Sequence, residues 1–234
     1  MQNSSQNDLL VHALAAAKAN LAKAQDEVVK AQKELDASQQ LYRLEMSRVV
    51  ETTPDLQSAL TNLVYVNEKD EIARYAFIEA GGYVFSVGIH PLIFSGGLGL
   101  GNLQRKIVRV AVGDKLNVKP YSPKSIPDLE MLYLDISNFA DSNLRECEID
   151  ADELITQLIR VFGGQIFTMT QIVAFEYYGS NYRFTVSNMT AGNQACSEPI
   201  SRGLLREKTT IIFTNSSQNL IKIGRWPNRF PPLV

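Results

Sequence analysis

The residues of this chain that could take part in chemistry are few and dispersed. Two cysteines and two histidines occur in 234 residues. Because no Cys-x-x-Cys motif is present, Cys147 and Cys196 predict neither a zinc site nor a disulfide framework, and they favour a reducing compartment. We expect an unreactive thiol at Cys196, which lies near Glu198, and a turn position for His90, which precedes a proline. The sequence therefore predicts no metal site.

A run of glycines suggests nucleotide binding at first sight. Residues 96–101 read GGLGLG, which lacks the spacing of the dinucleotide motif. Residues 107–112 have the composition of a strand, so we expect no helix there whose N-terminus could hold phosphate. The run is then a flexible loop between strands. No Gly-Lys-Ser or Gly-Lys-Thr occurs, so we expect no Walker-type phosphate loop and no ATP hydrolysis by this chain.

Three carboxylates stand immediately before an apolar run with helical spacing. Asp150, Asp152 and Glu153 could be taken for a metal site. Their position explains them better as a helix cap, since carboxylates at a helix start accept backbone hydrogen bonds and complement the helix dipole. We expect a helix over 150–162 that ends at Gly163. No Gly-x-Ser-x-Gly motif is present, and we expect no catalytic residue.

Basic residues offer a binding surface instead. Arg105, Lys106 and Arg109 form a small cluster in the sequence, and further cations follow at Arg183, Arg202, Arg206 and Lys208. If these residues line one groove, they could hold an acidic partner by charge-assisted contacts. The alternative is scattered, solvated surface charge, and charge alone does not decide between the two.

Composition excludes several classes of protein. Lys and Arg total 23 against 25 for Asp and Glu, a net charge of −2, which disfavours a uniformly basic nucleic-acid binder. An apolar share of 45% and a charged share of 21% are ordinary for a globular protein. No run of eighteen apolar residues and no secretory signal are present, so we expect no integral membrane segment.

The first part of the chain predicts a long helix. Residues from about 8 to 51 contain neither Gly nor Pro, and large apolar residues recur at seven-residue spacing, including Leu14, Leu21, Val28 and Leu35. Alanines lie four residues before most of them, which completes a narrow apolar stripe. Such a stripe predicts a coiled-coil arm that self-associates, although a solvated helix docked on the remaining chain is the alternative. Thr52-Thr53-Pro54 ends the helix, so the arm spans residues 1–54.

The remaining chain predicts mostly strands separated by turns. The expected strands cover residues 60–66, 83–87, 107–112, 115–118, 131–136, 166–169, 172–178, 182–186, 210–213 and 220–223. We place a β subdomain at 55–140 and a smaller α/β subdomain at 141–224. A proline-rich tail follows at 225–234. The fold class is α+β.

Several segments in collinear order resemble one known family. The quoted segments are QIVAFEYYGSNY at 171–182, LTNL at 60–63, QRK at 104–106, VGD at 112–114, QLI at 157–159 with Phe162 and Gln165, GLL at 203–205, IIF at 211–213 and IKI at 221–223. Together they resemble the N-terminal domain of N-ethylmaleimide-sensitive factor, the vesicle-fusing ATPase, most nearly in its plant form. The resemblance covers about residues 60–223.

The resemblance carries expectations about fold and function. It implies a double-psi β-barrel followed by a small α/β unit, with a groove between them that binds a SNAP-type adaptor on SNARE complexes. By position it implies that Arg105, Lys106 and Arg109 contact the adaptor, together with Arg145 before the second subdomain. It also implies a role in vesicle-mediated protein transport, SNARE disassembly and ER–Golgi traffic, in the cytoplasm and peripheral to Golgi or vesicle membranes.

The sequence departs from the family in what surrounds this domain. The family hydrolyses ATP with Mg in two further modules, which we do not find here, so we expect no cofactor in this chain. The helical arm is also outside the family pattern. The chain could be an adaptor-binding module that competes with the full-length ATPase, a substrate-recognition fragment of such an ATPase, or a coiled-coil scaffold.

Overall fold

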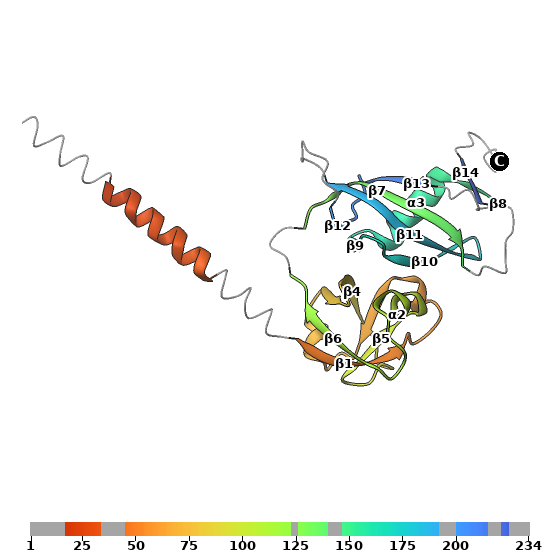
Figure 1. Cartoon of the computed structure of the whole chain (residues 1–234), viewed down its shortest axis with the longest axis horizontal. Helices are drawn as coiled ribbons and strands as arrows, with labels where there is room; N and C mark the ends of the chain where they lie inside the picture. The colour runs from red at the N-terminus through yellow and green to blue at the C-terminus, as the bar shows by residue number, and fades with distance from the viewer. Residues whose placement is uncertain are drawn as a thin grey trace, which may run out of the picture. The chain divides into compact units, whose positions relative to one another are not determined.

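The computed structural model describes residues 17–33, 45–122, 126–139, 147–191, 200–214 and 221–224. Its contacts separate two units, Met1–Leu44 and Glu45–Val234. In the first unit, residues 17–33 form a helix with every side chain exposed (Figure 1). Leu14 and Leu35 lie outside the described residues, so coiled-coil pairing stays a prediction.

The first half of the second unit is a closed six-stranded barrel, with the strand order β1-β5-β2-β4-β3-β6. Its elements are β1 (Met46–Thr52), η1 (Ser58–Leu60), β2 (Leu63–Val66), η2 (Glu71–Arg74), β3 (Phe77–Ala80), β4 (Tyr83–Ile89), β5 (Gly97–Leu100), α2 (Asn102–Val108) and β6 (Lys115–Pro120). Val50, Ile78, Phe85 and Leu98 are fully buried in its core. Closure leaves no unpaired strand edge in the barrel.

Strand β1 corrects the predicted extent of the helical arm. The helix was expected to continue to Glu51, but Met46–Thr52 pairs with β5 in parallel and with β6 in antiparallel orientation. Arg48 and Val50 point into the barrel, while their neighbours are more exposed. Two partner strands, burial of alternate side chains and the β-branched residues Val49, Val50 and Thr52 all favour a strand here.

The glycine run is a buried strand, so the expected flexible loop was wrong. All four residues of β5 are buried. A Cβ atom on Gly99 would lie 2.7 Å from Ile93 Cδ1, and one on Gly97 would lie 3.0 Å from the Phe94 carbonyl oxygen. These close approaches leave little room for a side chain at positions 97 and 99.

Helix α2 replaces the strand expected over residues 107–112. The helix follows Gly101 and stops at Arg109, whose backbone is left-handed with φ 59°. The helix was not expected because Ile107 and Val108 also suit a strand. The helix runs for only 7 residues.

The second half of the unit is a four-stranded sheet with a helix packed on it (Figure 1). The sheet order is β10 (Ile172–Tyr177), β11 (Ser180–Ala191), β7 (Leu129–Asn138) and β13 (Thr210–Thr214). Around it lie β8 (Cys147–Asp150), α3 (Ala151–Phe162), β9 (Ile166–Thr168), β12 (Arg202–Leu204) and β14 (Ile221–Gly224). The expected helix is confirmed, and Asp150 caps it by accepting hydrogen bonds from Asp152 N and Glu153 N.

Aromatic residues fix α3 against the sheet. The Phe162 ring lies 5.8 Å from that of Phe184 and 6.1 Å from that of Phe175, measured between centroids. All three side chains are buried. Edge and tilted ring contacts of this kind are favourable, so Phe162 anchors the last turn of α3.

Candidate functional site

A cleft of about 400 Å³ lies between the barrel and the α/β subdomain. The barrel wall comes from the end of β1, from η1 and from the start of α2; the opposite wall comes from β10, β11 and the residue after β7. Its described lining consists of Thr52, Thr53, Asp55, Leu56, Ala59, Leu60, Asn62, Gly101, Asn102, Leu103, Gln104, Arg105, Phe139, Ile172, Val173, Ala174 and Asn181.

The lining of this subdomain cleft is mainly apolar and neutral. Among the described lining residues, Arg105 is the cation and Asp55 the carboxylate. Leu56 on the barrel wall is 70% exposed, and Phe139 on the other wall is 38% exposed. An apolar surface with one cation suits a partner that brings apolar side chains and a carboxylate.

The single carboxylate of the cleft has a structural task. The Asp55 side chain accepts a hydrogen bond of 2.7 Å from Ser58 N at the start of η1. This backbone hydrogen bond lowers the pKa of Asp55, and the Ser58 side chain lowers it further. Asp55 is therefore ionised at neutral pH and holds the barrel wall of the cleft in place.

Helix α2 is fixed by a buried glutamine, and this fixes Arg105. The Gln104 side chain accepts a hydrogen bond of 2.7 Å from Gly101 N and donates one of 3.1 Å to the Leu63 carbonyl oxygen. The half-buried Arg105 donates from Nη1 to the Leu100 carbonyl oxygen. This contact ties the guanidinium group to the end of β5 while the residue lines the cleft.

A buried amide network joins the two subdomains beside the cleft. Asn62 Nδ2 donates to Gln165 Oε1 at 3.0 Å, and Gln165 Nε2 donates to the Thr61 carbonyl oxygen at 3.0 Å. Gln171 Nε2 completes the network with a bond of 3.3 Å to Asn62 Oδ1. Because the three amide side chains are at most 7% exposed, their hydrogen bonds fix the relation of the two subdomains.

An ion pair provides a second connection between the subdomains. Arg202 on β12 donates to both carboxylate oxygens of Glu79 on β3, at 3.2 and 3.3 Å, and to the Gly82 carbonyl oxygen at 2.9 Å. Although burial lowers the pKa of Arg202, its hydrogen bond to Glu79 raises the value overall. Arg202 is thus engaged within the protein and is not a groove cation of the kind that its sequence suggested.

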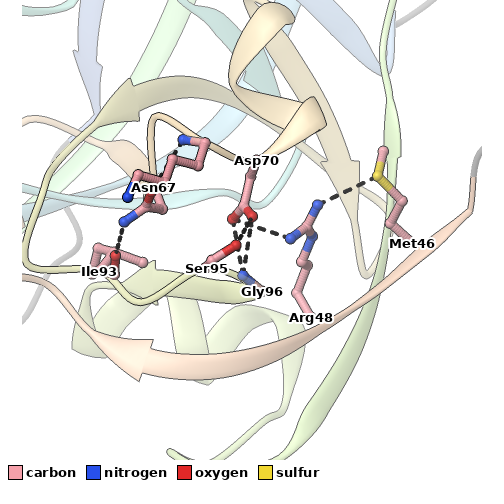
Figure 2. Close-up of polar contacts among 8 residues, drawn as sticks. Met46, Arg48, Asn67, Asp70, Ile93, Ser95 and Gly96 are labelled. Carbon is pink, nitrogen blue, oxygen red and sulfur yellow. Dashed lines mark hydrogen bonds and ion pairs between the residues drawn. The ribbon is translucent and has the colours of Figure 1, made fainter.

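A buried ion pair within the barrel supports the loop between β4 and β5. Figure 2 shows the Asp70 carboxylate between Arg48 and that loop: Arg48 Nη1 lies 3.1 Å from Asp70 Oδ2, while Ser95 Oγ donates to Oδ1 at 2.7 Å. Gly96 N also donates to this carboxylate at 3.1 Å. Both charged residues are 8% exposed. The pair therefore ties β1 to the loop that leads into β5.

The comparisons with known proteins agree with this architecture. Residues 148–215 match the family described as "Cell division protein 48 (CDC48), domain 2". The Arabidopsis thaliana "Vesicle-fusing ATPase" is 33% identical over 186 residues, 76% of this chain and 25% of that protein. The fission yeast Schizosaccharomyces pombe "Vesicular-fusion protein sec18" is 25% identical over 191 residues, 75% and 24% of the two chains. Its Saccharomyces cerevisiae counterpart is 26% identical over 187 residues.

The chain is homologous to the N-terminal region of vesicle-fusing ATPases. This confirms the family resemblance. The mixed α+β fold with its six-stranded barrel fits the matched family. The chain spans about a quarter of the length of the curated relatives that it matches.

Of the residues expected to bind the partner, one lines the cleft and two do not. Arg105 lines the cleft, whereas Lys106 and Arg109 are exposed at the end of α2 and just after it and are not among its lining residues. Arg145 lies outside the described residues. The sequence did not identify Leu56 and Phe139 as cleft residues, because only the packed subdomains bring these positions together.

The described residues include neither a cluster of metal ligands nor a membrane-spanning helix. No group of three or more His, Cys, Asp or Glu side chains in the described part of the chain could hold a metal ion. No helix among these residues is long and apolar enough to cross a bilayer.

Proposed function

We propose that this chain is a partner-binding module that recognises a SNAP-type adaptor on SNARE complexes through the subdomain cleft. Homology to vesicle-fusing ATPases supports a partner of this class. The observation that carries the proposal is that Arg105, the cation expected to meet the adaptor, lines a cleft between the two subdomains. The proposed setting is vesicle-mediated transport on the cytoplasmic side of Golgi or vesicle membranes.

The proposed contact combines charge with apolar burial. A carboxylate of the adaptor pairs with Arg105, while apolar side chains of the adaptor pack between Leu56 and Phe139. Lys106 and Arg109 are exposed and close in sequence to Arg105, and in this proposal they steer the acidic adaptor toward the cleft. Long-range steering raises the association rate and weakens with salt.

Neighbouring residues on α2 provide a matched test. Arg105→Glu reverses a charge that lines the cleft, and Lys106→Glu reverses one that does not. In capture of a purified SNAP adaptor, we expect Arg105→Glu to lower affinity by tenfold or more, since a charge-assisted hydrogen bond is replaced by repulsion. Lys106→Glu should lower it by less than about threefold, mostly at low salt. Equal retention of the adaptor by the unchanged protein and both variants contradicts the proposal.

The barrel topology supports a finer assignment of the fold. We propose that the barrel is of the double-psi type. Two parallel pairs, β1 with β5 and β2 with β4, are separated by the antiparallel pair of β5 with β2. The antiparallel pairs of β4 with β3, β3 with β6 and β6 with β1 close the barrel. An experimental structure of residues 45–234 that lacks these two parallel pairs would rule this out.

A second role is proposed for the arm. Leu21 and Val28, seven residues apart on the helix over 17–33, are 60% and 67% exposed. Exposed leucine and valine at heptad spacing favour pairing with a second helix. We propose self-association of the arm, which would raise adaptor avidity. Sedimentation should give an oligomer for the chain and a monomer for residues 45–234; a monomer in both cases argues against pairing.

A further inference from the structure

A second cavity lies on the α/β subdomain, beyond the last turn of α3. It has a volume of about 890 Å³ and is lined by Asp128, Thr156, Ile159, Arg160, Gly163, Gly164, Leu205, Arg206, Glu207 and Lys208. This groove shares no described lining residue with the subdomain cleft. Asp128 precedes β7 and Phe139 of the cleft follows it, so β7 separates the two, and a ten-residue strand extends for roughly 33 Å.

Some charged side chains of this groove form an ion pair and others have no partner among the described residues. Arg206 Nε pairs with Asp128 Oδ1 at 2.8 Å, which leaves these two lining charges neutralised. Arg160 and Lys208 are exposed, and neither has an ion-pair or hydrogen-bond partner among the described residues. Glu207 is the remaining acid of the lining. The available charge is therefore two cations against one carboxylate.

The floor of the groove is shaped for a polypeptide. Ile159 is half-buried and Leu205 is buried, and together they give the groove an apolar base. Gly164 has φ +81° and no heavy atom within 4 Å of where a Cβ would stand, so a chain can approach the backbone there. The described residues of its lining include no aromatic side chain, which disfavours single-stranded nucleic acid because that ligand class is bound by stacking.

We propose that this groove binds a short acidic peptide segment of a protein partner, with an apolar side chain of the peptide on Ile159 and Leu205 and its carboxylates on Arg160 and Lys208. The surface goes beyond the adaptor cleft and would let the chain hold two protein segments at once. Charge-assisted contacts to an exposed arginine and lysine give specificity for carboxylates over neutral peptides.

A competing explanation for Arg160 is intrinsic to the helix. A cation in the last turn of α3 stabilises the helix dipole without any ligand. That explanation predicts a change of thermal stability when the charge is removed and no change in peptide binding. Lys208 lies outside the helix, so the dipole does not account for it.

Fluorescence anisotropy of the full chain with a labelled peptide of glutamate and leucine tests the proposal. We expect Arg160→Glu with Lys208→Glu to weaken binding by about tenfold or more. The control is Arg74→Glu with Lys115→Glu, which makes the same charge change at exposed barrel positions outside both cavities and should alter affinity by less than about twofold. If the charge-reversed variant fails to fold, Arg160→Gln with Lys208→Gln replaces it. Thermal unfolding checks that this neutral variant is folded, and its affinity for the peptide should also fall.

Each other outcome overturns the proposal. Equal weakening by the two charge-reversed pairs indicates non-specific attraction, and undetectable binding removes the site. Better competition by inorganic phosphate or oligouridylate than by unlabelled peptide makes the ligand class wrong. Because the adaptor cleft also accepts a carboxylate with apolar side chains, the titrations are repeated in the Arg105→Glu background, where Arg160→Glu with Lys208→Glu should still weaken binding by about tenfold or more. No further weakening in that background overturns the groove proposal and leaves the adaptor cleft untouched.

Discussion

Replacing Gln165 with leucine should loosen the junction between the two subdomains. Gln165 accepts a hydrogen bond from Asn62 Nδ2 and donates one to the Thr61 carbonyl oxygen, both at 3.0 Å. Leucine has a similar volume but can make neither contact. The substitution therefore leaves a donor and an acceptor of the barrel without these partners at the junction.

The size of the effect follows from the burial of those groups. Asn62 is 5% exposed, so its orphaned N–H costs about 1–3 kcal/mol. The half-buried Thr61 contributes less. Part of this loss of stability is offset because moving a leucine side chain from water into the protein interior is more favourable than moving a glutamine side chain. We expect the free energy of unfolding to fall by about 2–4 kcal/mol.

Urea denaturation followed by circular dichroism measures this loss. The control is Gln157→Leu on α3, a half-buried glutamine for which the structure gives no hydrogen bond among the described side chains. The midpoint should fall clearly in Gln165→Leu and little in Gln157→Leu, with the denaturant slope unchanged if the subdomains still unfold together. Equal midpoints would refute the claim that the amide network holds the junction.

Three further predictions concern the barrel, the sheet and the arm. Asp70→Ala should destabilise the chain by about 3–5 kcal/mol in urea denaturation because it strands the buried Arg48 charge, and Arg48→Met added to it should restore much of the loss. Burial and a hydrogen bond with Cys147 raise the pKa of Tyr182 to about 12 from 10.0. The folded protein favours the neutral phenol, so its contribution to the free energy of unfolding is fully present below pH 10 and is lost as the pH rises through 12. In Tyr182→Phe, the free energy of unfolding measured against pH should fall less steeply over this range. Removal of residues 1–44 should leave the thermal midpoint of the remaining chain unchanged, since the contacts place it in a separate unit, and a lower midpoint would contradict this division.

Locally determined features were predictable from the sequence. The helix over 150–162 carries its own cap in Asp150 and its own apolar face, so its limits followed from nearby residues alone. The strands expected over 172–178 and 182–186 are also found, as β10 and β11, although β11 begins two residues earlier, at Ser180, after a turn at Tyr178 and Gly179.

Features set by distant partners were not predictable in the same way. Strand β1 directly follows a segment of good helix formers without Gly or Pro, and its limits depend on pairing with β5 and β6. The distinction between Arg105 and Lys106 depends on the rotation of a short helix that the sequence did not reveal. The mainly apolar lining of the cleft likewise arises only when the subdomains pack, whereas the sequence had suggested a groove rich in cations.

The most direct test of adaptor binding in the cleft is site-specific photo-crosslinking. A photoreactive residue replaces Leu56, which lines the cleft and is 70% exposed, or Val112, which is 55% exposed and does not line it. Each protein is mixed with a purified SNAP adaptor and irradiated. A covalent adduct from position 56 and little from position 112 is the predicted result, whereas adducts from position 112 alone would contradict binding in the cleft.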